Sequence, residues 1–160
     1  MPKTELLAGI IARLEAELAL LTSAALATHA EATDEENKAE DKYDTRGLEA
    51  SYLAHGQSKA AEETALAVAQ FRALSPRDAT AGDPISLGAL VIVADAGGRQ
   101  SRYFIGPRAG GTEVTFGAHT IMVITPQSPL GRELVGRRLG DRVAIPLGGK
   151  RSELTISQII

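Results

Sequence analysis

The residues of this 160-residue chain with the clearest chemical potential are the carboxylates between residues 31 and 44. This segment has a net charge of −5, because two lysines accompany seven acidic side chains: Glu31, Asp34, Glu35, Glu36, Glu40, Asp41 and Asp44. Clustered carboxylates bind hard cations such as Mg²⁺, but the ion needs further oxygens to complete an octahedron. A metal site here would therefore need a partner to supply them. The alternative interpretation is a solvated turn whose charges bind nothing.

Other kinds of site chemistry are weakly represented. The chain has no cysteine, which excludes disulfides, thiolate metal sites and cysteine nucleophiles. Its three histidines, at positions 29, 55 and 119, are isolated and lack the spacing of a zinc site. Only 4% of residues are aromatic and the net charge is −3, which argues against direct binding of nucleic acid. Since no apolar run is long enough to span a membrane and no signal peptide is apparent, we expect a cytoplasmic protein without a membrane partner.

The first half of the chain has the pattern of two long helices. Residues 1–80 carry a net charge of −6 and only three of the 16 glycines, whereas the second half carries +3. Seam residues alternate at spacings of three and four from Leu7 to Thr28 and from Ala50 to Leu74, which is typical of helices that pack on one another. Thr4 is the expected N-cap of the first helix. We expect an antiparallel coiled-coil hairpin over residues 1–76, with the acidic segment at its tip.

The second half has the pattern of a small sheet domain. Short apolar runs separated by glycine-rich turns predict about five strands, at 87–94, 102–105, 120–125, 142–147 and 152–160. Residues 128–135 predict a short helix, with Ser128 as N-cap and Pro129 as its first residue. We expect a linker at 77–84 and a domain at 85–160 whose core lies after Asp78. The fold class is thus α+β.

The segment from Ile124 to Ile160 resembles the C-terminal signature of the bacterial Gre (GreA/GreB) transcript-cleavage factors. The match rests on eight residues: Ser128, Pro129, Leu130, Gly131, Leu134, Gly136, Gly140 and Asp141. The resemblance implies an N-terminal coiled-coil hairpin with an acidic tip. It also implies a C-terminal domain similar to the FK506-binding-protein (FKBP-like) fold, an antiparallel sheet with one short helix.

The resemblance further implies a bacterial transcription elongation factor that is not an enzyme by itself. Its globular domain would dock on the rim of the secondary channel of RNA polymerase, and its hairpin would reach the polymerase active site. There the tip carboxylates would help hold a second Mg²⁺, and the polymerase would hydrolyse its own backtracked transcript. The factor would have no cofactor of its own and would meet nascent RNA only indirectly. The resemblance assigns partner binding in the globular domain to Ser128, Pro129, Leu130 and Gly131.

The tip departs from the family pattern D-x-x-E-N-A-E-Y. The E-N step is kept at Glu36-Asn37, but Asp34 precedes Glu36 by two residues instead of three. The resemblance assigns the catalytic, metal-holding role in trans to Asp34 and Glu36, with Glu35 as the alternative. Asn37 and Tyr43 would be supporting contacts to the partner. The changed spacing leaves open a non-cleaving channel binder that modulates or inhibits polymerase, and a coiled-coil adaptor for another partner is also open.

Four arginines cluster in the sequence near the signature, at positions 132, 137, 138 and 142. Two interpretations stay open for them. They are solvated charges at the edge of the domain, or they dock on an acidic surface of the polymerase.

Overall fold

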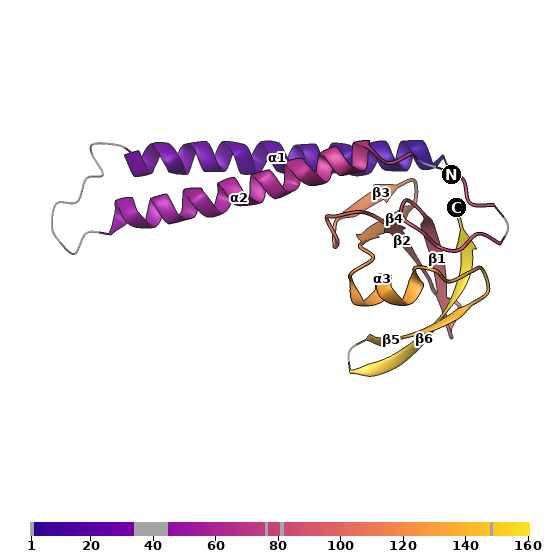
Figure 1. Cartoon of the computed structure of the whole chain (residues 1–160). Helices are drawn as coiled ribbons and strands as arrows, with labels where there is room; N and C mark the ends of the chain where they lie inside the picture. Colours follow the sequence, from indigo (N-terminus) through magenta and orange to yellow (C-terminus); the bar gives the residue numbers. More distant parts are fainter. Residues whose placement is uncertain (1, 34–44, 76, 81, 148) are drawn as a thin grey trace. The chain divides into compact units, whose positions relative to one another are not determined.

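A computed structural model of the chain describes residues 2–33, 45–75, 77–80, 82–147 and 149–160 (Figure 1). Within these residues the elements follow the order α1 (Lys3–Thr33), α2 (Arg46–Arg72), β1 (Leu90–Asp95), β2 (Gln100–Ile105), β3 (Glu113–Phe116), β4 (His119–Ile124), α3 (Pro129–Leu134), β5 (Arg142–Leu147) and β6 (Lys150–Ile159). The predicted α+β class, with two long helices followed by a sheet and one short helix, is confirmed. The helices in these ranges lack the combination of length and apolar character that crossing a lipid bilayer requires.

Residues Ala12–Ala69 form one compact unit, the helical hairpin. Its parts of α1 and α2 lie side by side and run in opposite directions (Figure 1). Several buried side chains of this unit are small, including Ala25, Ala54 and Ala67. Small side chains allow two helices to approach closely, which explains why the alternating spacing of the sequence produces a hairpin.

The first turn of α1 differs from its prediction. The carbonyl oxygen of Pro2 accepts hydrogen bonds from the backbone N–H groups of Glu5 (3.1 Å) and Leu6 (3.3 Å). The helix therefore begins at Lys3, and Thr4 already lies inside it. The predicted N-cap at Thr4 is wrong, because the chain enters its helical turn directly after Pro2.

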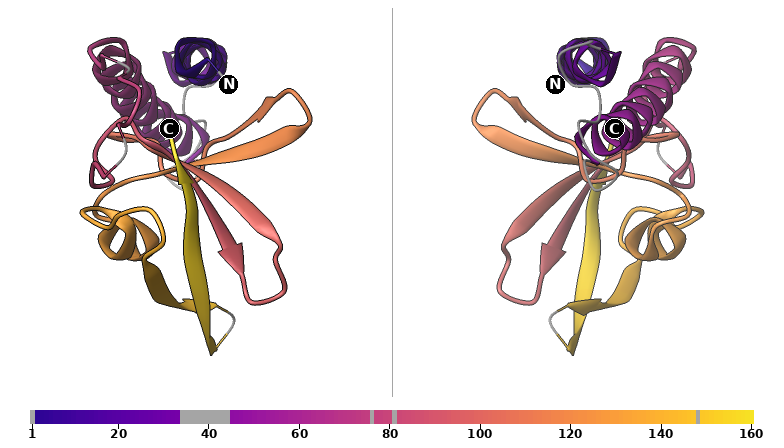
Figure 2. Two further views of the ribbon diagram at one scale, coloured as in Figure 1. Left: turned by 90° about the vertical axis from the view of Figure 1, so that its right-hand side faces the viewer. Right: turned by 90° about the vertical axis from the view of Figure 1, so that its left-hand side faces the viewer.

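The second compact unit comprises Met1–Ile11 and Gln70–Ile160 and contains the sheet. The strand order is β3-β4-β2-β1-β6-β5, with β2 and β4 parallel and the other neighbours antiparallel. Figure 2 shows the twist of this sheet, with α3 lying to one side of it. The described residues thus form six strands where about five were predicted. The additional strand, β3, pairs with β4 across a two-residue turn whose first residue, Gly117, has φ 61°.

One face of the sheet packs with α3 into the main core. Ile105 of β2 and Leu134 of α3 are fully buried in this cluster, whose other members are Ile85, Ala89, Val91, Val93, Ile124, Val143, Ile145, Leu154 and Ile156. All of these residues lie after Asp78, where the sequence placed the core. This face therefore needs no residue from the hairpin range 1–76.

The other face of the sheet is buried by residues from the predicted hairpin range. Leu90, Phe104 and Val123 lie on this second face, as the register of β1, β2 and β4 requires, and all are almost completely buried. The ring of Phe71 stacks on that of Phe104, with 6.2 Å between the ring centroids. The compact sheet unit accordingly includes the start of α1 and the end of α2. The predicted division into a hairpin, a linker and a globular domain, at 1–76, 77–84 and 85–160, stays a prediction.

The packing of Phe71 predicts a large effect of its truncation. Phe71→Ala removes a fully buried ring, and we expect the free energy of unfolding to fall by about 3–5 kcal/mol. Urea denaturation followed by circular dichroism measures this loss. Leu66→Ala is the matched control, since Leu66 lies on the same helix and is exposed; its cost should stay below about 1 kcal/mol. Equal losses in the two variants would contradict the packing of Phe71 against the sheet.

Candidate functional site

The predicted tip residues Asp34, Glu35, Glu36, Asn37 and Tyr43 lie outside the described residues. The structure does describe the helix ends on either side of them. α1 ends at Thr33, whose hydroxyl donates to the carbonyl oxygen of His29 at 3.0 Å. α2 begins at Arg46, and just before it the hydroxyl of Thr45 donates to Oε1 of Glu49 at 2.8 Å. The acidic segment therefore connects the end of one hairpin helix to the start of the other.

The described part of the chain contains no group of three or more His, Asp or Glu side chains arranged to hold a metal ion. The assignment of Mg²⁺ to Asp34 and Glu36 stays a prediction. His29 and His55, which are far apart in the sequence, line one hollow of about 700 Å³ between the two helices of the hairpin. Sequence patterns do not predict that these two histidines line one hollow, because they lie on different helices.

The first predicted docking residue, Ser128, is the N-cap of α3. Its Oγ accepts the backbone N–H of Gly131 at 3.0 Å and donates to the carbonyl oxygen of Thr125 at 2.7 Å. Pro129 follows as the first helical residue, where its missing N–H costs nothing. The predicted cap and helix start are confirmed. This capping arrangement fixes the chain as it leaves β4.

Two further docking residues also have structural roles. Leu130 is half-buried and packs against the main core. Gly131 is buried, and a Cβ at this position would collide with the carbonyl oxygen of Thr125 and lie 2.9 Å from Oγ of Ser128. Of the four residues, Pro129 alone is classed as exposed. Capping, packing and close backbone approach thus account for much of the signature, and its role in docking stays a prediction.

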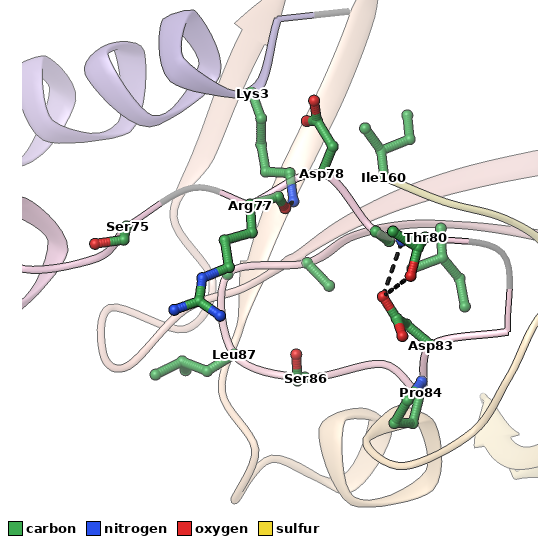
Figure 3. A pocket seen from close by; sticks show the side chains of 14 residues that line it. Lys3, Ser75, Arg77, Asp78, Thr80, Asp83, Pro84, Ser86, Leu87 and Ile160 are labelled. Carbon is green, nitrogen blue, oxygen red and sulfur yellow. Dashed lines mark hydrogen bonds between the residues drawn. The ribbon is translucent and has the colours of Figure 1, made fainter.

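A pocket of about 570 Å³ in the sheet unit is lined by Lys3, by residues of the segment 75–89 and by Ile159 and Ile160 (Figure 3). Lys3 is only 5% exposed, and its ammonium donates to the carbonyl oxygen of Arg77. Burial lowers the pKa of Lys3, and the nearby charge of Asp78 opposes that shift. The sequence did not suggest this contact, because its partners are 74 positions apart.

On the acidic side of the same pocket, Thr80 forms two hydrogen bonds with the carboxylate of Asp83. Its hydroxyl and its backbone N–H donate to Oδ2 of Asp83 at 2.5 and 2.9 Å (Figure 3). These hydrogen bonds lower the pKa of Asp83. Two cations, Lys3 and Arg77, and two carboxylates, Asp78 and Asp83, line the pocket.

The close approach at Gly131 predicts a strong and specific loss of stability. Gly131→Ala forces a methyl group onto the Thr125 carbonyl, and we expect a loss of more than about 2 kcal/mol in the free energy of unfolding. Ser128→Ala removes the cap and should cost about 1 kcal/mol. Gly9→Ala is the matched control: the site on α1 is open, so alanine should stabilise by about 0.5–1 kcal/mol. Urea midpoints measure all three, and a Gly131→Ala protein as stable as the parent would contradict this geometry.

The buried Lys3 predicts a pH dependence. Because its pKa is lower in the folded chain than its ordinary value of 10.5, the unfolded chain holds this proton more tightly. The free energy of unfolding therefore rises with pH between the folded pKa and 10.5, as the folded chain loses the proton first. Lys3→Met lacks this contribution. As the pH is raised toward 10.5, the urea midpoint of the parent should rise relative to that of Lys3→Met, whereas Lys59→Met, at an exposed site, should follow the parent. Parallel profiles for the parent and Lys3→Met would contradict the burial of the ammonium.

Comparison with known proteins identifies the family. Residues 80–160 match the family described as "Transcription elongation factor, GreA/GreB, C-term". A comparison with curated proteins gives no match. Similar solved structures include the transcription factor Gfh1, at 22% identity and a TM-score of 0.41, over 94% of this chain and 93% of that one. GreA factor homolog 1 (Gfh1) of Thermus thermophilus gives 19% identity and a TM-score of 0.41, over 94% of each chain.

A third similar structure is the transcription elongation factor GreA/GreB from Nitrosomonas europaea. It has 16% identity and a TM-score of 0.39, over 70% of this chain and 91% of that one. The family match covers half of the present chain, including α3, its capping arrangement and the whole sheet. The chain belongs to the GreA/GreB family of transcription elongation factors.

Proposed function

We propose that this chain binds bacterial RNA polymerase through the secondary channel and stimulates Mg²⁺-dependent cleavage of a backtracked transcript by the polymerase's own active site. The main support is the family membership carried by residues 80–160. The helical hairpin adds to it, because its two helices flank a segment of net charge −5. Membership of the family makes the protein an accessory factor to RNA polymerase.

The chemistry assigns separate roles to the tip and the polymerase. Asp34 and Glu36, with Glu35 as the alternative, would present carboxylate oxygens to an ion shared with the polymerase. Because Mg²⁺ needs further oxygens to complete its octahedron, the remaining ligands would come from the partner. A second Mg²⁺ in such a site would lower the pKa of the water molecule bound to it. It would also neutralise the charge that develops during phosphodiester hydrolysis.

Docking would involve the globular domain as well as the tip. Pro129 is exposed at the start of α3, where Ser128, Leu130 and Gly131 hold it in place. Asn37 and Tyr43 would support the tip inside the polymerase. Nascent RNA would be held by the polymerase, so the factor itself needs no RNA-binding surface. A protein with this partner would act in the cytoplasm.

The spacing of the tip carboxylates favours a second candidate function, a channel binder that does not stimulate cleavage. Asp34 and Glu36 are two positions apart, whereas residues three apart share a face of a helical turn. A pair that cannot face one ion would leave polymerase binding intact and remove metal holding. The protein would then modulate or inhibit polymerase by occupying its channel.

A transcript-cleavage assay distinguishes the two functions. Stalled, backtracked elongation complexes with labelled RNA are mixed with Mg²⁺ and the parent protein, Asp34→Ala, Glu36→Ala or Glu63→Ala. The parent should release a short 3′ fragment, and each tip variant should slow that release at least about tenfold, a loss of more than about 1.4 kcal/mol of transition-state stabilisation. Glu63→Ala, an exposed carboxylate on α2 away from the tip, should cleave like the parent.

Each result of this assay has one meaning. Polymerase binding without a fragment supports the non-cleaving function and contradicts cleavage stimulation. Equal cleavage by the parent and both tip variants contradicts the assignment of Asp34 and Glu36. Failure of the parent to bind core polymerase at moderate salt contradicts both functions and supports an adaptor for another partner.

A further inference from the structure

Lys3 places a charged group at the wall of the pocket of about 570 Å³ in the sheet unit. Among the residues that the structure describes, it is the one charged side chain that is buried. A buried ammonium group is costly unless its N–H groups find acceptors. A lysine ammonium has three such donors, and the carbonyl oxygen of Arg77 is its hydrogen-bond partner within the described residues. The remaining donors therefore need acceptors from whatever fills the pocket.

The guanidinium of Arg77 is a second cation that lines the same pocket. Arg77 is exposed, and within the described ranges its guanidinium has no hydrogen bond or ion pair. A guanidinium binds a carboxylate through two parallel N–H···O bonds, and charge-assisted bonds of this kind are strong. Lys3 and Arg77 together thus offer this pocket the donors that a carboxylate group requires.

Asp83 offers an acceptor on another side of the pocket. Its Oδ2 accepts both hydrogen bonds from Thr80, whereas its Oδ1 has no hydrogen bond to the described residues. Figure 3 shows Asp83 and the side chain of Arg77 on opposite sides of the pocket. Because the Thr80 bonds fix the orientation of the carboxylate, its second oxygen is held ready to accept an N–H group from an ammonium.

Apolar side chains complete the lining. Leu87 is 47% exposed, and Ile159 lines the same pocket while it also packs against the main core. Pockets for small molecules typically have volumes of about 300–1,000 Å³ and combine apolar walls with a few polar groups that fix the orientation of the ligand. The pocket at Lys3 has both properties.

We infer that this pocket binds a small zwitterion of the amino-acid type, with its carboxylate at Lys3 and Arg77 and its ammonium at Asp83. An apolar side chain on the ligand would contact Leu87 and Ile159, where its burial adds to the affinity. The inference goes beyond the proposed function and does not depend on it, because the pocket is formed by this chain alone.

The charges that line the pocket favour a zwitterion over a simple ion. A ligand with only a negative charge would be repelled by Asp78 and Asp83, and a ligand with only a positive charge would be repelled by Lys3 and Arg77. Like charges placed close together cost binding free energy. A ligand that carries one charge of each sign can place each of them beside its opposite.

Isothermal titration calorimetry of the full chain with three compounds that share an isobutyl group tests the inference. The zwitterion is L-leucine, whereas 4-methylpentanoate lacks the ammonium and 3-methylbutylamine lacks the carboxylate. The zwitterion should bind at least about tenfold more tightly than either single ion, because only it can use both charged sides of the pocket. It should also raise the urea midpoint, since a ligand that binds only the folded chain stabilises it.

Variants with unchanged circular dichroism identify the groups that bind. Lys3→Met, Arg77→Gln and Asp83→Asn should each weaken the binding of L-leucine at least about tenfold. Arg77→Gln keeps the test informative if the other two variants fold poorly, because its side chain is exposed. Lys59→Met and Glu63→Gln remove the same kinds of charge at exposed sites on α2, outside the pocket, and should bind like the parent.

Each contrary result overturns a stated part of the inference. If L-leucine at up to about 10 mM gives neither heat nor a shift of the urea midpoint, the pocket is not a zwitterion site. Equal affinity for L-leucine and 4-methylpentanoate overturns the role of Asp83. Parent-like binding by Arg77→Gln and Lys3→Met overturns the location of the site. Since polymerase takes no part in this titration, all of these results leave the proposed function standing.

Discussion

A sheet that is apolar on both faces needs two covers, and this requirement organises the sheet unit. β1 begins with four consecutive buried residues, Leu90 to Val93, which is typical of a strand covered on both faces. The short helix α3 covers one face through Leu134. Phe71, at the end of α2, covers the other by stacking on Phe104. The hairpin helices are therefore more than a support for the tip, because their first and last turns belong to the same compact unit as the sheet.

Much of this architecture could be predicted from local patterns. The seam spacings of three and four predicted the two helices, and Ser128-Pro129 predicted the start of α3. The sequence did not predict β3, because this strand has only four residues and their alternating exposure is a weak pattern. The double role of α2 was hidden for another reason: the periodicity of an apolar seam is the same whether the helix packs on a helix or on a sheet. The contact of Lys3 with Arg77 was also hidden, since no local pattern connects residues so far apart.

The candidate site, too, could be predicted from the sequence only in part. The motif around Ser128 identified the family, yet the structure assigns its residues mostly to capping, packing and close backbone approach. A family signature of this kind reports what the fold requires. The four clustered arginines at positions 132, 137, 138 and 142 are exposed, and exposure fits both interpretations that the sequence left open, solvated charges and docking. The tip carboxylates carry the proposed chemistry, and for them the sequence is still the source of the assignment.

The position of β6 in the sheet has a consequence for the order in which the chain folds during synthesis. β6 lies between β1 and β5, and its pairing with β1 joins Val91 to Ile159. The helical hairpin, by contrast, is complete once residue 69 has left the ribosome. Until β6 has been made, the backbone N–H and C=O groups along one edge of β1 lack their strand partner. Such long-range strand pairing is slow and leaves the nascent chain open to wrong contacts. The hairpin would therefore form before the sheet is complete.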